Sequence, residues 1–120
     1  MDQLFRSIFL LSENIRYVAL LNQGNLTTSM KKDLAGASSA ESDKYEELIV
    51  NPGILTLVKQ RGNIDCGGAD YVLIRYGNFF QFMMPTDEGH LSVSIAPEGD
   101  PMALVEPIRK LLVEYKLLGG

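Results

Sequence analysis

The residues best suited to chemistry in this sequence are its single cysteine, Cys66, and its single histidine, His90. A thiol and an imidazole can act as nucleophile and base when the fold brings them together, whatever their separation along the chain. The residue before the thiol is Asp65, whose negative charge disfavours the reactive thiolate. No pattern indicates an oxyanion hole or a carboxylate that orients His90. The sequence therefore predicts no catalytic residues, with Cys66 in a loop pocket and His90 on the polar row of a strand.

Metal and phosphate chemistry also lack the residues they need. One His and one Cys are too few for a metal site, which requires three or four ligands at suitable spacing. Gly62 and Gly67 have the spacing of a phosphate loop, but Gly68 and Ala69 stand where its lysine and its serine or threonine belong. We therefore expect no metal and no cofactor, and a glycine-rich connection into an edge strand.

A group of charged residues marks the first turns of a helical segment in the middle of the chain: Glu41, Asp43, Lys44, Glu46 and Glu47. Negative charge near a helix start complements the helix dipole. The pattern predicts a solvated face for these carboxylates. The alternative is a surface that binds a partner.

Composition and charge narrow the possible classes of protein. The 120 residues are 46% hydrophobic and 22% charged, which is typical of one globular domain spanning residues 1–120. A formal charge of −4 and a pI near 4.9 argue against binding to nucleic acid or to an anionic membrane. No apolar run approaches the roughly 20 residues of a membrane span, and segment 4–11 lacks the basic start of a secretion signal. With a single Cys, we expect a cytoplasmic protein.

Apolar patterns and turn residues predict five strands. Four of them lie at 15–22, 26–30, 71–76 and 79–84, and the fifth begins at His90 after a turn at 85–89. The dipeptide Gly24-Asn25 joins the first two strands, and Gly77-Asn78 joins the next two, because both suit tight hairpins. The fifth strand alternates an apolar face with a face that carries His90, Ser92 and Ser94. Three of the other strands are apolar on both faces, so helices must cover both sides of the sheet.

Helical periodicity predicts three helical segments. The first covers residues 2–12, and the middle one begins at a capping box formed by Ser38 and Glu41. A proline disfavours helix at the residue before it, so Asn51-Pro52-Gly53 predicts a break in the middle helix. The last helix is capped by Asp100-Pro101, and Pro107 predicts either a kink or a true start at Glu106.

The middle helix is apolar nearly all round, with Leu48, Ile49, Val50, Ile54, Leu55, Leu57 and Val58. Such a helix must be covered on both sides. One side packs on the sheet, and we expect a second copy of the chain to cover the other. In the alternative, the break at Pro52 rotates the two halves so that each buries its own apolar face within one chain.

The order of elements resembles a Roadblock / dynein light-chain domain of the profilin-like group, over essentially the whole chain. The resemblance rests on the hairpin turns Gly24-Asn25 and Gly77-Asn78, on the position of the middle helix, and on the Ala96-Pro97 loop before the last helix. The opening Ile15-Arg16-Tyr17-Val18 is similar to small stand-alone archaeal members. The resemblance implies a three-layer α+β fold, with a five-stranded antiparallel sheet, the first and last helices on one face and the middle helix on the other.

This resemblance also implies a function that depends on binding. Family members pair through the middle helix and the edge strand after it, scaffold complexes and regulate small GTPases. Carried over to this chain, it implies a non-enzymatic homodimer whose interface includes Leu48, Leu55, Val58, Tyr71, Val72, Leu73 and Arg75. The predicted break at Asn51-Pro52-Gly53 departs from the uninterrupted helix that such packing needs.

A second class of function also fits the order of elements. A PAS-like or GAF-like sensing domain would hold an apolar small molecule between sheet and helix. Four residues are candidates to line such a pocket, or else to form plain core: Phe80, Phe82, Met83 and Met84.

Overall fold

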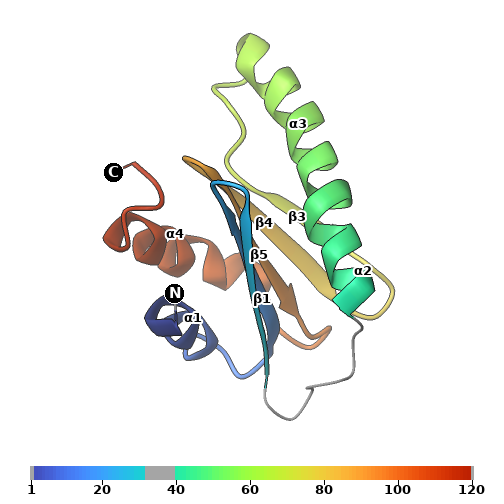
Figure 1. The fold of residues 1–120 in the computed structure, drawn as a ribbon, viewed down its shortest axis with the longest axis vertical. Helices are drawn as coiled ribbons and strands as arrows, with labels where there is room; N and C mark the ends of the chain where they lie inside the picture. The colour runs from blue at the N-terminus through green and yellow to red at the C-terminus, as the bar shows by residue number, and fades with distance from the viewer. Residues whose placement is uncertain (1, 32–39, 120) are drawn as a thin grey trace.

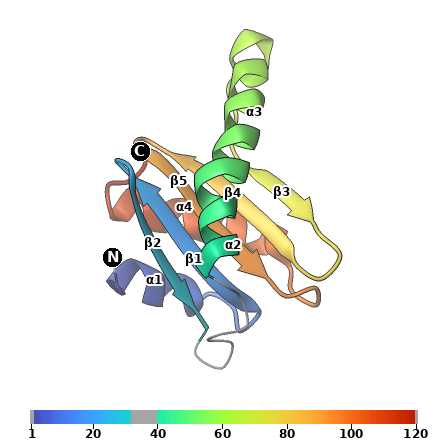
Figure 2. The ribbon, with the colours of Figure 1, turned by 45° about the vertical axis from the view of Figure 1, so that its right-hand side comes forward.

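The sheet joins distant parts of the chain. The structure is a computed structural model that describes residues 2–31 and 40–119. Its five strands are β1 (Ile15–Asn22), β2 (Asn25–Met30), β3 (Val72–Arg75), β4 (Phe80–Thr86) and β5 (Gly89–Ile95). They lie in the order β2-β1-β5-β4-β3, and every neighbouring pair is antiparallel (Figure 2). Strand β5 therefore connects the hairpin β1–β2 to the hairpin β3–β4.

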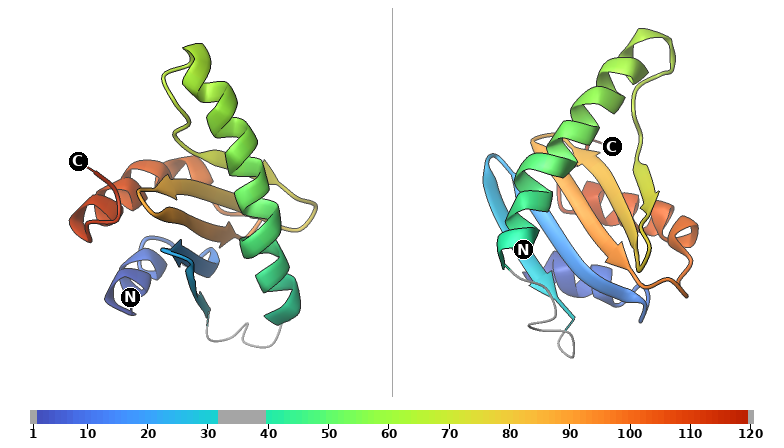
Figure 3. Two further views of the ribbon diagram at one scale, coloured as in Figure 1. Left: turned by 45° about the horizontal axis from the view of Figure 1, so that its top comes forward. Right: turned by 90° about the vertical axis from the view of Figure 1, so that its right-hand side faces the viewer.

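Helices cover both faces of this sheet. Helices α1 (Asp2–Phe9) and α4 (Val105–Glu114) lie on one face (Figure 1). The middle helix lies on the other face and consists of α2 (Ala40–Tyr45), a π-helical turn (Glu46–Val50) and α3 (Asn51–Asp65). Figure 3 shows the sheet between these two helical layers. The predicted three-layer α+β fold is confirmed.

The main core lies between the sheet and the helices α1 and α4. Alternate residues of the central strands point into it and are fully buried, as period-two geometry requires. Helix residues at three- and four-residue spacing complete it. Its members include Leu4, Ile8, Val18, Leu20, Phe82, Met84, Leu91, Val93, Ile108 and Leu112.

The middle helix is continuous, so the predicted break at Asn51-Pro52-Gly53 is wrong. The turn before the proline is π-helical, and the N–H of Asn51 donates to the carbonyl of Glu46, five residues earlier. A proline ring clashes with the carbonyl four residues before it in a regular α-helix, and a wider turn relieves that clash. Pro52 then lies in the first turn of α3, where it is well tolerated. The helix projects beyond the sheet as a single rod (Figure 1).

The other helix ends follow their local signals closely. Helix α1 begins at Asp2 as predicted but ends three residues earlier, at Phe9. A 3-10 turn, Pro101–Leu104, precedes α4, so Pro107 falls in the first turn of α4 and produces no kink within it. The helix therefore starts at Val105, one residue before the start that was predicted at Glu106. The predicted capping box depends on the side chains of Ser38 and Glu41, which are not among those that the structure describes.

Only the first hairpin turn differs from its prediction by one position. The first turn is Gln23-Gly24 rather than Gly24-Asn25, because Asn22 pairs with Asn25 and both turn residues have positive φ, 53° and 80°. The second turn is Gly77-Asn78 as predicted. The third is shorter than predicted, and Pro85 belongs to β4, opposite His90. Strand β3 ends before this point, so the missing N–H of Pro85 interrupts no ladder.

Glycines at the end of α3 and just after it shape the connection to β3. Gly67 and Gly68 have φ of 80° and 91°, and the N–H of Gly68 donates to the carbonyl of Gly62 (3.0 Å). A Cβ on Gly62 would lie 2.9 Å from the carbonyl carbon of Gly68. Only glycine allows this close approach, which turns the chain back toward the sheet.

Candidate functional site

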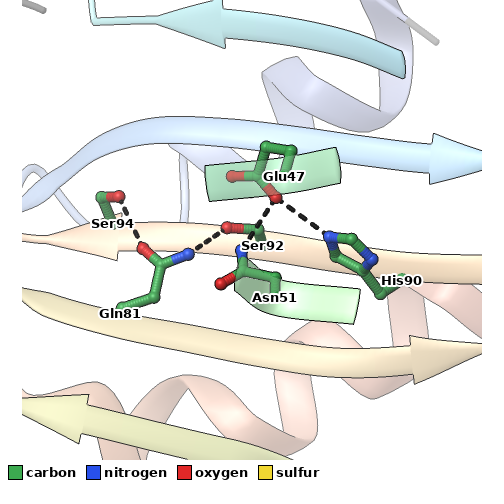
Figure 4. Close-up of polar contacts among 6 residues, drawn as sticks. All are labelled: Glu47, Asn51, Gln81, His90, Ser92 and Ser94. Atoms are coloured by element: carbon green, nitrogen blue, oxygen red, sulfur yellow. Dashed lines mark hydrogen bonds and ion pairs between the residues drawn. The ribbon is translucent and has the colours of Figure 1, made fainter. Parts of the chain in front are cut away.

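A row of polar side chains crosses the sheet beneath the middle helix. Ser92 and Ser94 of β5 both bond to Gln81 of β4, and the Ser94 hydroxyl donates to Gln81 Oε1 (3.0 Å). Gln81 and Ser92 are buried. The face of β5 that carries His90, Ser92 and Ser94 is therefore covered by a helix through polar contacts (Figure 4).

The contact between helix and sheet centres on a buried carboxylate. Glu47 is 0% exposed and reaches the sheet from the π-helical turn. Its Oε1 lies 2.9 Å from His90 Nε2 and accepts a hydrogen bond from Asn51 Nδ2, also at 2.9 Å. A carboxylate only accepts hydrogen bonds, so His90 Nε2 carries the proton. The three side chains join the helix to β5 away from water.

Two sequence predictions are wrong. Glu47 was predicted on a solvated face with the other acidic residues, and it is fully buried. Cys66 was predicted to fill a loop pocket, and it is exposed. His90 lies on the polar row of β5, as predicted, and contacts Glu47. Cys66 is exposed at the far end of α3, where its Sγ lies 3.4 Å from Asp65 Oδ1. At 1.5 Å rise per residue, Glu47 and Cys66 are about 28 Å apart along the helix, so no thiol–imidazole pair forms.

A cavity of about 310 Å³ lies beside this cluster, between the first turns of the middle helix and the sheet. Its lining is largely polar and charged: Arg16, Tyr17, Met30, Ser42, Asp43, Glu46, Glu47, Asn78, Phe79, Gln81 and Ser94. The four residues proposed for an apolar pocket do not line it. Phe82, Met83 and Met84 are buried, and Phe80 packs against the core.

The inner wall of the cavity holds the carboxyl groups of Glu46 and Glu47 and the hydroxyl of Tyr17. Burial, followed by the carboxylates of Glu47 and Asp43, raises the pKa of Glu46. Burial and the same two carboxylates also raise the pKa of Tyr17, so its hydroxyl keeps its proton at physiological pH. Oxygens without a hydrogen bond of normal geometry are Tyr17 Oη, Glu46 Oε1 and Glu47 Oε2. Sequence reasoning missed Tyr17 because it stands within an apolar strand.

Replacing Glu46 with glutamine should raise the free energy of unfolding at pH 7. The folded protein holds the Glu46 proton more tightly than the unfolded chain, so stability is lost as pH rises from about 4.5 toward the folded pKa. Solvent screening limits the gain to about 1 kcal/mol. Urea denaturation between pH 3 and pH 8 measures it, with Glu114→Gln on α4 as the control for charge. A less stable Glu46→Gln protein at pH 7 would contradict this interpretation.

The residues predicted for the dimer interface occupy three environments. Leu48 and Arg75 are exposed, and the guanidinium of Arg75 lies 5.0 Å from the ring centre of Phe80. Leu55 is buried against the sheet. The remaining four are half-buried at the start of the edge strand and on α3: Val58, Tyr71, Val72 and Leu73.

The side of the middle helix that faces away from the sheet carries large apolar residues. Asn51, Leu55 and Gly62 are the buried residues of α3, and helical spacing places Ile49, Leu57 and Ile64 opposite them. These three side chains are 63%, 69% and 75% exposed. We call them, with the exposed Tyr45 and Leu48, the outer helix face. Sequence reasoning included Ile49 and Leu57 in the apolar middle segment but missed Ile64.

Two other kinds of site were sought in the described part of the chain. Within residues 2–31 and 40–119, no group of three or more His, Cys, Asp or Glu side chains is placed to hold a metal ion. Over the same residues, no helix is both long enough and apolar enough to cross a membrane.

Comparisons with known proteins identify the fold. No family model matches the sequence, and no curated protein matches it either. The structure is similar to the crystal structure of a Roadblock/LC7 domain from Streptomyces avermitilis, with a TM-score of 0.76 and 16% sequence identity. The match covers 97% of this chain and 94% of the other. The class defined here is a three-layer α+β domain, and within that class the chain has the Roadblock/LC7 fold.

Proposed function

We propose that this chain is a single, non-enzymatic interaction domain that forms a homodimer and acts as a cytoplasmic scaffold or regulator. The observation that carries the proposal is the outer helix face, where Ile49, Leu57 and Ile64 are each more than 60% exposed. Aligned large apolar side chains of this kind are typical of an interaction surface. The separation of Cys66 from His90 supports a function without catalysis.

The open edge of the sheet supports the same proposal. Strand β3 is an edge strand that pairs only with β4 within the sheet. The N–H of Tyr76 donates to the carbonyl of Phe79 (2.9 Å), so hydrogen-bonded and non-bonded pairs alternate from that turn. By this alternation the N–H groups of Leu73 and Arg75 point to the free edge. A second copy can pair with this edge and join two sheets into one.

The test of strand pairing is a proline at each outward N–H. We expect Leu73→Pro and Arg75→Pro to give a monomer, because each removes a donor from the paired edge while β4 keeps its own bonds. Light scattering or sedimentation measures the mass of each variant against the unmodified dimer. Val72→Pro is the control, since its N–H faces β4 and its loss should lower stability instead.

Two outcomes would contradict the proposal. One is a monomeric unmodified protein at micromolar concentration. The other is a dimer of unchanged affinity in both Leu73→Pro and Arg75→Pro, which would exclude pairing through this edge while leaving the outer helix face to be tested separately.

We assign a small GTPase as the class of protein partner, on the resemblance in element order. The formal charge of −4 supports a protein partner over nucleic acid. Cys66→Ser should leave partner binding intact, because the thiol is exposed and lies far from the buried cluster.

A further inference from the structure

The middle helix carries a glycine that its own chain does not require. Gly53 lies near the middle of the continuous helix that runs from Ala40 to Asp65. It is not among the glycines with positive φ, and a Cβ placed on it would meet no other part of the chain within 4 Å. Glycine in a helix interior costs stability relative to alanine. Its presence at an open position indicates a close approach by something outside the chain.

Gly53 interrupts a row of large side chains on the side of the helix that faces away from the sheet. Asn51 and Leu55 are buried against the sheet, and Gly53 lies two positions from each of them, which places it on the opposite side. Residues at four-residue spacing on that side form one row, and all of them are exposed. The row consists of Tyr45, Ile49, Gly53, Leu57 and Arg61. It is therefore a ridge with a gap at its centre.

Such a ridge matches a second helix of the same kind. When rows at four-residue spacing interdigitate, two helices cross at about 50°, and the side chains at the crossing set the distance between their axes. A glycine at the crossing allows the shortest distance. Ile49 and Leu57 lie four residues before and after Gly53, so in an antiparallel pair Ile49 of each copy faces Leu57 of the other. The ridge is self-complementary, as a two-fold interface requires.

The two ends of the ridge favour a second copy of the chain over an unrelated partner. Tyr45 and Arg61 each lie eight residues from Gly53, which is about 12 Å along the helix. An antiparallel pair therefore brings the guanidinium of Arg61 in each copy to the ring of Tyr45 in the other, and an aromatic face attracts such a cation. Arg61 also pairs with Asp65 of its own helix, but these side chains are 64% and 68% exposed, and exposed pairs contribute little.

We propose that two copies of this chain pack their middle helices antiparallel across a two-fold axis at Gly53, with Ile49 of each copy against Leu57 of the other. The inference rests on the proposed homodimer and names the point at which the two helices cross. Strand pairing through β3 is a separate route to a homodimer, so variants at Gly53 and at Leu73 test different contacts.

The first test separates dimerisation from folding. We expect Gly53→Leu to raise the Kd of the dimer at least about tenfold, because a large side chain at the crossing forces the helices apart. Below that Kd, the urea midpoint should equal or exceed that of the unmodified chain, since leucine favours the helix and its Cβ meets no other part of the chain. Sedimentation measures the Kd of the full chain, and circular dichroism follows its unfolding.

Asn63→Leu is the matched control. Asn63 is exposed on the same helix, about 15 Å from Gly53 along the axis and outside the ridge, so the Kd should not change. An unchanged Kd in Gly53→Leu would overturn the crossing and leave the homodimer standing. A monomeric unmodified chain at micromolar concentration would overturn both.

The second test places a thiol on the proposed axis. Gly53→Cys in a Cys66→Ser background should form a disulfide between two copies under a mild oxidant. Axes about 8–10 Å apart place the two Cα atoms about 3.5–5.5 Å apart, and disulfides span about 4.4–6.8 Å. Asn63→Cys in the same background should stay unlinked, because an antiparallel pair separates its two copies by about 30 Å. Non-reducing electrophoresis detects the linked dimer, and a link in Asn63→Cys without one in Gly53→Cys would overturn the antiparallel crossing.

Discussion

Replacing His90 with leucine is expected to lower the free energy of unfolding by about 1–3 kcal/mol. Leucine fills much of the same space, but it removes the hydrogen-bond partner that Glu47 Oε1 shares with Asn51. The loss of one partner from a buried hydrogen-bonded pair costs more than the loss of both, because the polar group that remains is buried without its partner. Urea denaturation at pH 7 and fixed protein concentration measures the change.

Two companion variants separate charge from packing. His90→Gln keeps a donor that can reach Glu47, so its cost should be smaller than that of leucine. The double variant Glu47→Leu/His90→Leu removes both polar groups and should recover much of the loss. A single His90→Leu variant that loses less than about 1 kcal/mol would show that the pair contributes little to holding the helix on the sheet.

The second large effect is expected at the outer helix face. A double variant, Ile49→Lys/Leu57→Lys, should dissociate the proposed dimer with a rise in Kd of at least about 100-fold. Burial of one such side chain contributes about 1.5–3 kcal/mol, and each occurs twice across a two-fold interface. Sedimentation measures the Kd directly. The fold should survive, because both side chains are already exposed within one chain.

The matched control is Leu10→Lys. Leu10 is 87% exposed just after α1, on the other side of the sheet, and receives the same change of chemistry. It should leave the mass unchanged. If Leu10→Lys dissociates the dimer and Ile49→Lys/Leu57→Lys does not, the interface lies on the face of α1 and α4 instead.

Most of the fold could be predicted from local patterns, because strand periodicity and turn residues act over a few positions. Strands β1 and β4 carry apolar residues on both faces, which predicted that both faces are buried. Burial of both faces in turn required helices on both sides of the sheet. The continuity of the middle helix could not be predicted, because the conformation around Pro52 depends on a π-helical turn that contacts the sheet. A proline has the same local preference whether or not such a turn precedes it.

The candidate site was harder to predict than the fold, because its contacts join residues far apart in sequence. Glu47 and His90 are separated by 43 positions, and neither has a local pattern that marks burial. Glu47 stands among other acidic residues, which usually form a solvated face. The one sequence signal is the spacing of Glu47 and Asn51, which places both on the same side of the helix as Leu55.

The central position of β5 has a consequence for the order of events during synthesis. Until residues 89–95 have left the ribosome, the growing chain holds two hairpins with no hydrogen bonds between them. Each hairpin alone is at most marginally stable in water. His90 is synthesised 43 positions after Glu47, so the middle helix leaves the ribosome before the residue that Glu47 contacts on the sheet. The nascent chain therefore exposes the apolar residues of β1 and β4 at once, which makes this interval the one in which the chain is most prone to aggregate.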